Sequence, residues 1–327
     1  MNITLFGLQK DGIGGVSRYV QNLTDNMDIR DYIVLYKREI IKNNKKYFGY
    51  ISSLLYQPFY HIKSDVIHSL NGTNSYYKSD VITIHDLYFD NTKYKYSVMF
   101  FLTPSLIRYK LHKLKIIVPS QLVKQQFVSL FHSDYNLYVV PHGIDFKYID
   151  SLDLKNPFIT KNNIVIAGGV DFKRRNQIYL LDKLKNTNYN VYVIGYGFMY
   201  VLKEKYKNNS NLHFIKNSSD ELFYSYLKYS DLNLYNTLGE GFGYIIYESL
   251  YLGKKMLVNN NSDNHLLFGN YANYYNEESP ENYVDDFQYQ IEKNMYKTVD
   301  FKRGLEKNYS IKNMVDKTMD VYNEVLQ

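Results

Sequence analysis

The sequence contains 327 residues, of which 39 are lysine or arginine and 33 are acidic, so its formal net charge is +6. This length is large for one domain and predicts two domains of about 150 residues each. The chain has no cysteine, which excludes disulfides, thiolate metal sites and cysteine nucleophiles. No apolar run approaches the roughly 18 residues of a membrane-spanning helix, and Met1 leads directly into an apolar strand pattern. We therefore expect a cytoplasmic protein without a signal peptide.

The positive net charge favours an anionic partner, such as a nucleotide, an anionic membrane surface or nucleic acid. The alternative is a lysine-rich composition without functional meaning. The sequence has no dense run of lysine and arginine, which makes nucleic acid the least favoured of the three partners.

The first predicted unit is a strand over residues 3–6, a glycine-rich loop over 7–15 and an amphipathic helix. Apolar residues recur at helical spacing after the loop, at Val16, Tyr19, Val20, Leu23 and Met27. The segment Gly12-Ile13-Gly14-Gly15 can be compared with a dinucleotide-binding fingerprint. However, Ser17 stands where the third glycine of that fingerprint belongs, which weakens this interpretation.

Short apolar runs over residues 65–68 and 81–84 predict two buried parallel strands. The second run ends in His85-Asp86-Leu87. Because ligands of open α/β sheets bind beyond the carboxyl ends of the strands, His85 is a candidate site residue. The alternative is a structural histidine.

Residues 94–115 are rich in aromatic and basic side chains. The stretch is too short, and too interrupted by Pro104, to span a bilayer. It predicts either an amphipathic helix on an anionic membrane surface or a partly buried helix with a solvated basic face. A strand over 116–118 then leads to Ser120 as a helix N-cap. The polar stretch 150–163 is the expected interdomain linker.

The second domain is predicted to begin with a strand over residues 164–167, followed by Gly168, Gly169 and three adjacent cations. The cations are Lys173, Arg174 and Arg175. Cations after a strand and glycines suit a pyrophosphate clamp, because their charge offsets that of the ligand. A solvated basic loop is the alternative. A further strand over 191–194 ends at Gly195, and a strand over 212–215 precedes Asn217 and Ser218.

Residues 231–258 predict a strand, a glycine loop, a helix and a second strand, which is half of a nucleotide-binding α/β unit. Gly241 and Gly243 allow the backbone to approach a ligand, and the N–H groups of the new helix favour phosphate. Glu240 and Glu248 are suited to accept hydrogen bonds from sugar hydroxyls. The alternative is a helix N-terminus with two solvated glutamates.

The spacing from Glu240 to Glu248, with Gly241-Phe242-Gly243 after the first glutamate, resembles the E-x7-E signature of retaining glycosyltransferases of family 4. Thr83-Ile84-His85-Asp86-Leu87 resembles the V-T-x-H-D-L segment of that family. The segment 138–145, which contains Pro141-His142-Gly143-Ile144-Asp145, is similar to the V-x-P-x-G-x-D segment that closes its first domain. The resemblance extends over essentially the whole chain.

This resemblance implies an α/β protein of GT-B architecture, with two Rossmann-like parallel-sheet domains facing across a cleft. The expected boundaries are an acceptor-side domain over 1–150, a domain that binds the nucleotide sugar over 151–305, and a C-terminal helix over 306–327 that returns to the first domain. It also implies roles for particular residues. The expected catalytic residues are His85 and Glu240, and the expected acceptor-side residues are Arg18 and Asp86. The expected donor-binding residues are Gly14, Gly15, Gly169, Lys173, Arg174, Arg175, Gly195, Asn217, Ser218, Gly241, Phe242, Gly243, Tyr244 and Glu248.

The implied reaction is retaining transfer of a hexose from a nucleotide-diphosphate sugar, a UDP- or GDP-sugar, to a glycan, lipid-linked or other hydroxyl acceptor. We expect no cofactor and no metal, since no Asp-x-Asp motif occurs. Peripheral association with the inner membrane face is a further expectation. The alternatives are a nucleic-acid-modifying glucosyltransferase of GT-B architecture and a non-catalytic homologue that binds sugar nucleotides. The cation that carries most of the phosphate binding stays open among Lys173, Arg174 and Arg175.

Overall fold

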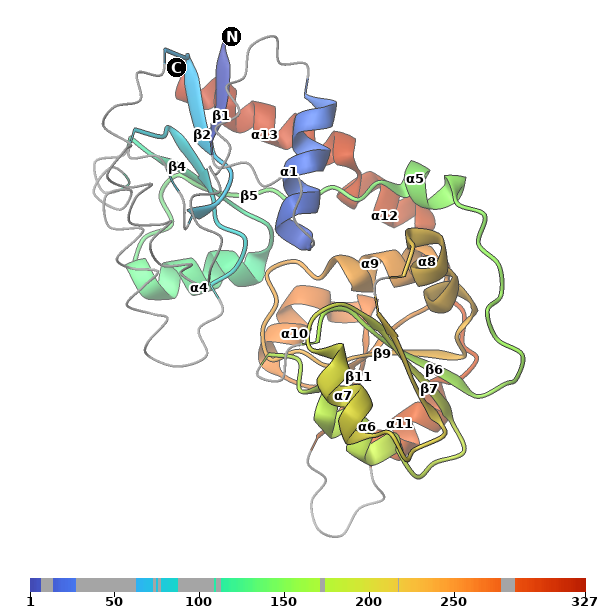
Figure 1. Ribbon diagram of the computed structural model, residues 1–327. Coiled ribbons are helices and arrows are strands. Elements are labelled where there is room, and N and C mark those ends of the chain that lie inside the picture. The colour runs from blue at the N-terminus through green and yellow to red at the C-terminus, as the bar shows by residue number, and fades with distance from the viewer. Residues whose placement is uncertain are drawn as a thin grey trace. The chain divides into compact units, whose positions relative to one another are not determined.

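The computed structural model describes residues 1–6, 14–27, 63–72, 75, 78–87, 109, 113–170, 174–216, 218–277 and 286–327. The chain divides into two compact units (Figure 1). The N-terminal unit comprises residues 1–144 and 308–327, and the C-terminal unit comprises residues 145–307. Each unit contains one sheet of parallel strands, which confirms the predicted α/β class.

The sheet of the N-terminal unit has the order β1-β2-β3-β4-β5, and every neighbouring pair is parallel. The strands are β1 (Ile3–Phe6), β2 (Val66–Ser69), β3 (Val81–Thr83), β4 (Lys115–Val118) and β5 (Leu137–Val139). They are short apolar runs because helices cover both faces of the sheet. The strands predicted over 65–68 and 81–84 are present: β2 begins and ends one residue later than predicted, and β3 ends one residue earlier.

The helices of this unit pack on the two faces of the sheet. Helices α1 (Gly15–Asn26) and α13 (Ile311–Val325) share a buried cluster with Ile117 of β4. Helix α4 (Gln121–Phe131) shares the other cluster with Ile116 and Val118. Since successive side chains of a strand point to opposite faces, α1 and α13 cover one face and α4 covers the other. Ser120 caps α4 as predicted, accepting a hydrogen bond from the backbone of Val123.

The sheet of the C-terminal unit has the order β11-β10-β9-β6-β7-β8, again with parallel neighbours throughout. Its strands are β6 (Asn163–Ala167), β7 (Asn190–Gly195), β8 (Leu212–Lys216), β9 (Leu232–Tyr235), β10 (Leu257–Asn259) and β11 (Asn273–Tyr275). Its helices are α5 (Phe146–Ser151), α6 (Gln177–Leu184), α7 (Met199–Lys205), α8 (Asp220–Tyr229), α9 (Tyr244–Tyr251), α10 (Ser262–Phe268), the 3-10 helix η3 (Gly269–Tyr271) and α11 (Asp286–Asn294), followed by α12 (Lys302–Tyr309) at its end.

The C-terminal helix α13 completes the core of the N-terminal unit. Its Met314, Val321 and Tyr322 are buried in the same cluster as Tyr19 and Leu23 of α1. The backbone N–H of residue 144 donates to the carbonyl of residue 309 at 2.8 Å, which holds the returning segment in place. No helix within the described ranges is both long and apolar enough to cross a membrane. Most of the aromatic and basic stretch 94–115 lies outside the described residues.

Candidate active site

The loops that follow three neighbouring strands of the C-terminal unit bring most of the predicted site residues together. Strands β9, β6 and β7 are adjacent and parallel, so their carboxyl ends meet at one edge of the sheet. The backbone N–H of Leu238, after β9, donates to the carbonyl of Arg174, after β6, at 2.8 Å. The N–H of Val170 likewise donates to the carbonyl of Tyr196, after β7, at 2.8 Å. The predicted glycines and arginines therefore share one edge.

Glu240 is held by both predicted arginines. Its carboxylate lies 2.9 Å from Nη2 of Arg174 and 3.2 Å from Nη2 of Arg175, and it accepts a hydrogen bond of 2.8 Å from the hydroxyl of Tyr235. Burial by itself would raise the pKa of Glu240, but Arg175 and Arg174 outweigh it and hold the pKa below its usual value. The carboxyl is therefore ionised at neutral pH.

The two arginines are not a solvated basic loop. Only 24% of the Arg174 side chain and 16% of the Arg175 side chain are exposed. The guanidinium of Arg175 lies over the ring of Tyr235, 4.6 Å from its centroid, and its buried Nη1 has no hydrogen-bond partner among the described residues. Nε of Arg174 donates to the carbonyl of Gly239 at 2.6 Å. Lys173, the third predicted cation, lies outside the described residues.

Two glycines of the edge have a steric reason to be glycine. A Cβ on Gly169 would lie 2.9 Å from the ring of Tyr196, and a Cβ on Gly195 would lie 2.0 Å from the carbonyl oxygen of Gly168. A side chain at either position would collide with the neighbouring loop. Glycine at these two positions therefore allows the loops after β6 and β7 to pack closely together.

The glycine loop and helix α9 have the predicted arrangement. Gly243 is the N-cap of α9 with φ +81°, and a Cβ on it would lie 2.6 Å from the ring of Phe268. The first N–H groups of α9 follow it and provide a positive helix end. Phe242 is buried and packs against Tyr244 and Tyr247, so its ring fixes the loop from within the core. Only its backbone can face a ligand.

Glu248 lies one turn into α9 and is 2% exposed. Its Oε1 accepts a hydrogen bond of 3.0 Å from the hydroxyl of Tyr224 on α8. The interpretation of Glu240 and Glu248 as solvated glutamates is therefore wrong. Ser218 lies half-buried just before α8, whereas Asn217 falls outside the described residues.

His85 of the N-terminal unit lies after β3, and both of its ring nitrogens have protein partners. Nε2 is 2.7 Å from the carbonyl oxygen of Leu70, and Nδ1 is 3.2 Å from Nε2 of His142. A carbonyl only accepts, so Nε2 of His85 carries the proton and Nδ1 accepts the N–H of His142. Burial lowers the pKa of His85 to about 4, so the ring is neutral at pH 7. A sugar hydroxyl would have to replace one of these two partners.

The ring of His142 contacts His85, although sequence analysis assigned no role to the side chain of His142. The ring of Tyr19 packs against both histidines, with centroids 4.9 Å from that of His85 and 4.7 Å from that of His142. The signal available in the sequence was the place of His142 in the segment Pro141-His142-Gly143-Ile144-Asp145 after β5. Strand order alone could not reveal that its ring meets His85.

The remaining predicted residues of the N-terminal unit lie around α1 and β3. Gly14 is the N-cap of α1 with φ +128°, and Gly15 is the first helical residue rather than a loop residue. Arg18 is half-buried on the first turn, and Asp86 is exposed beside His85. Because β1 and β3 belong to one parallel sheet, the start of α1 and His85 follow strand ends at the same edge.

A buried polar chain lies behind His85. Nδ1 of His68 is 2.6 Å from the hydroxyl of Tyr322, and its Nε2 is 2.8 Å from the hydroxyl of Thr83, which also meets the hydroxyl of Tyr19 at 2.9 Å. Burial, aided by the charge of His85, lowers the pKa of His68 to about 3. This chain joins β2, β3, α1 and α13 without a net charge.

We expect the free energy of unfolding to fall as the pH drops from about 6.5 toward 4. The folded His68 and His85 stay neutral in this range, whereas an unfolded histidine binds a proton near pH 6.5. A histidine whose pKa is lowered by folding stabilises the protein at pH values above the pKa of the unfolded histidine. Below that pKa the stabilisation is lost, by at most roughly 1.4 kcal/mol per pH unit for each histidine. Urea unfolding at pH 7.5, 6.0 and 5.0 measures this slope.

His68→Gln should flatten the slope, and His132→Gln, at an exposed position of the same unit, should leave it unchanged. An unfolding free energy that is equal at pH 7.5 and pH 5.0 would show that these buried histidines are not the source of acid sensitivity.

Residues 150–303 match the family described as Glycosyl transferases group 1. These residues, which make up most of the C-terminal unit, belong to the group 1 glycosyltransferases. This match supports the glycosyltransferase activity with a nucleotide-sugar donor that the resemblance to family 4 implied. No curated protein matches the sequence of this glycosyltransferase at a significant level.

Solved structures similar to this glycosyltransferase have the GT-B fold and confirm the predicted architecture. HepE of Anabaena in complex with UDP and glucose aligns with a TM-score of 0.67 and 11% identity, over 99% of this chain and 100% of that chain. Sucrose-phosphate synthase of Thermosynechococcus elongatus aligns with a TM-score of 0.71 and 13% identity, over 99% of this chain and 98% of that chain. WaaG, a glycosyltransferase involved in lipopolysaccharide biosynthesis, aligns with a TM-score of 0.60 and 14% identity, over 99% of this chain and 95% of that chain.

Proposed function

We propose that this group 1 glycosyltransferase moves a hexose from a UDP- or GDP-sugar to a hydroxyl of a glycan or lipid-linked acceptor, with retention of anomeric configuration and without a divalent metal. The observation that carries the proposal is the ionised Glu240, which contacts both Arg174 and Arg175. These three residues lie at the same sheet edge as Gly169 and Gly195, close in sequence to the start of α9. A carboxylate in this place occupies the cations that a diphosphate would need. The similar structure of HepE contains UDP and glucose, which supports a nucleotide-sugar donor.

In the proposed cycle, the diphosphate of the donor replaces Glu240 as the partner of Arg174 and Arg175. Arg175 can make this exchange without moving far, because its buried Nη1 has a donor to spare. The N–H groups at the start of α9 bind the same phosphates. Glu240, once released, accepts hydrogen bonds from hydroxyls of the donor sugar, and Glu248 holds the ribose. Fixed cations and amides thus take the place of a metal in neutralising the diphosphate.

The transfer itself breaks the bond between the anomeric carbon and the diphosphate oxygen. The acceptor oxygen bonds to that carbon on the same face, and its proton passes to the departing phosphate oxygen. Positive charge that develops at the anomeric carbon is stabilised by Glu240, and the negative charge on the diphosphate is stabilised by Arg174 and Arg175. The family resemblance assigns His85 a role in orienting the donor sugar. The similarity to WaaG, a glycosyltransferase involved in lipopolysaccharide biosynthesis, supports a glycan or lipid-linked acceptor.

A panel of UDP-, GDP-, ADP- and dTDP-sugars tests this function by thermal shift and by slow donor hydrolysis, each in the presence and absence of EDTA. The correct donor at 100 times its Kd should add about 2.7 kcal/mol of stability and a few degrees of Tm. Hydrolysis should release the sugar with its donor configuration and should continue in EDTA.

A melting curve that no sugar nucleotide and no free diphosphate shifts would rule out the donor class. Binding without any hydrolysis or transfer would favour the non-catalytic homologue instead. Activity that stops in EDTA and returns with magnesium or manganese would contradict metal-independent transfer.

A further inference from the structure

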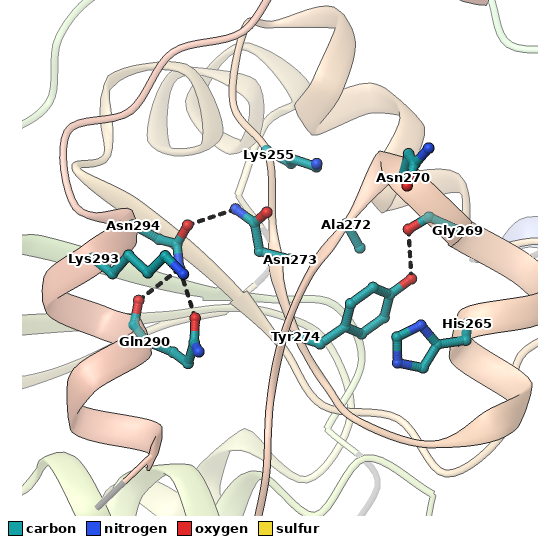
Figure 2. A pocket seen from close by; sticks show the side chains of 10 residues that line it. All are labelled: Lys255, His265, Gly269, Asn270, Ala272, Asn273, Tyr274, Gln290, Lys293 and Asn294. Atoms are coloured by element: carbon teal, nitrogen blue, oxygen red, sulfur yellow. Dashed lines mark hydrogen bonds between the residues drawn. The ribbon is translucent and has the colours of Figure 1, made fainter. Parts of the chain in front are cut away.

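A cavity of about 510 Å³ lies in the C-terminal unit (Figure 2). Lys255 lies two residues before β10, Ala272 directly precedes β11, and Asn273 is the first residue of β11. The proposed donor site follows the carboxyl ends of β6, β7 and β9. Since all six strands are parallel, this cavity opens from the amino ends of β10 and β11, at the opposite edge of the same sheet. Its volume suits a small-molecule ligand.

The cavity is positively charged. Lys255 and Lys293 line it, and none of the described residues around it is acidic. Neither ammonium group forms an ion pair with a described residue. Burial lowers the pKa of Lys255, which shows that part of its hydration has been removed without compensation by a carboxylate. Two cations without counter-charges around one cavity favour an anion.

The walls of the cavity also offer many neutral hydrogen-bonding groups. One wall is a chain of amides in which Nδ2 of Asn273 donates to Oδ1 of Asn294 at 2.7 Å, and Nδ2 of Asn294 donates to the carbonyl of Gln290 at 2.7 Å (Figure 2). These bonds fix the amides and leave Oδ1 of Asn273 able to accept. Asn270, in η3, lines another side of the cavity.

The wall opposite the amide chain is aromatic. The rings of His265 and Tyr274 are stacked, with centroids 3.8 Å apart and planes at 27° (Figure 2). The hydroxyl of Tyr274 donates to the carbonyl of Gly269 at 2.8 Å, which fixes its ring. The aromatic ring can pack against the apolar face of a sugar ring, and the amides can bind its hydroxyls. The two ammonium groups can bind the anionic group of an acidic sugar.

We propose that this cavity is a binding site for an anionic monosaccharide unit, one that carries a phosphate or a carboxylate, distinct from the donor site. Lys255 and Lys293 bind the anionic group, the amides of Asn270 and Asn273 bind hydroxyls, and Tyr274 supports the sugar ring. Such a site gives the enzyme a second point of attachment for an acidic glycan.

Isothermal titration calorimetry of the full-length protein tests the site with four probes: glucose 6-phosphate, glucuronate, glucose and inorganic phosphate. UDP is kept saturating throughout, so that the arginines of the donor site are occupied. We expect at least one acidic sugar to bind more tightly than glucose and than phosphate. Lys255→Gln/Lys293→Gln should weaken that binding about tenfold or more, and Asn270→Asp, which places a carboxylate in the cavity, should abolish it.

Lys297→Gln/Lys317→Gln is the matched control, because it removes the same charge at two exposed positions outside the cavity. It should leave the affinity unchanged. The proposal is overturned if neither acidic sugar binds in the presence of UDP, or if the control weakens binding as much as the cavity variant does. Equal affinity for phosphate and glucose 6-phosphate would overturn the assignment of a sugar ligand.

Discussion

Glu240→Gln should lower turnover about 10²-fold or more while UDP or GDP still binds. Glutamine keeps the shape of the side chain but removes the charge that stabilises the anomeric carbon in the proposed transition state. It also leaves Arg174 and Arg175 without the carboxylate that each contacts. A bound diphosphate supplies that missing negative charge, so the affinity for the free nucleotide diphosphate should be equal to or higher than in the wild type. Calorimetry for the diphosphate and kcat for the sugar nucleotide give the two values.

Two other glutamates make the test specific. Glu221→Gln, at an exposed position on α8, should change neither value. Glu248→Gln should weaken binding of the free nucleotide, because its proposed partner is the ribose. If Glu240→Gln instead abolishes binding of the diphosphate while Glu248→Gln leaves it intact, the two glutamates have the opposite roles.

Gly195→Ala should destabilise the C-terminal unit by about 3 kcal/mol, which corresponds to a decrease of roughly 6–12 °C in Tm. Gly195 has φ +155°, a conformation that residues with a side chain rarely adopt. A Cβ there would lie 2.0 Å from the carbonyl oxygen of Gly168, so strands β6 and β7 would have to separate at the edge that carries the proposed site. Thermal unfolding with and without UDP measures both the stability and the loss of nucleotide binding.

Gly304→Ala is the matched control for this effect. Gly304 lies in helix α12, and a Cβ on it would meet no atom within 4 Å. Alanine should therefore stabilise the protein by roughly 0.5–1 kcal/mol, because it favours the helix. A Gly195→Ala protein with an unchanged Tm would show that the two loops can separate easily, and the steric reason for this glycine would be wrong.

The sequence determined the elements that position the site. The run over 231–258 predicted β9, the glycine loop, α9 and β10, because a short apolar run, two glycines and a helical pattern each reflect a local preference of the backbone. Gly253 lies just beyond the end of α9 and has the left-handed conformation that glycine favours at such a position. His85 was placed correctly after β3 for the same reason, since a strand end is visible in the sequence.

The partners of those residues were decided only by the tertiary structure. Arg175 meets Glu240 across 65 positions of the sequence, and His85 meets His142 across 57. Sequence spacing indicated a pyrophosphate clamp and a site histidine but no partners for them, and the structure pairs the arginines with a carboxylate and the histidine with a second ring. These pairs form because parallel strands bring distant loops to one edge, and the order of strands in a sheet is set by packing of the whole unit.

The cavity beside β10 and β11 has the same origin. Lys255 lies in the loop before β10, Asn273 in β11 and Lys293 in α11, and the sequence assigned no site role to any of the three. Likewise, the hydroxyl of Tyr322 reaches His68 across 254 positions because α13 packs beside α1. Local preference therefore determined which residues begin and end each strand and helix of the site. Burial of apolar faces between distant segments determined which charges and rings face one another.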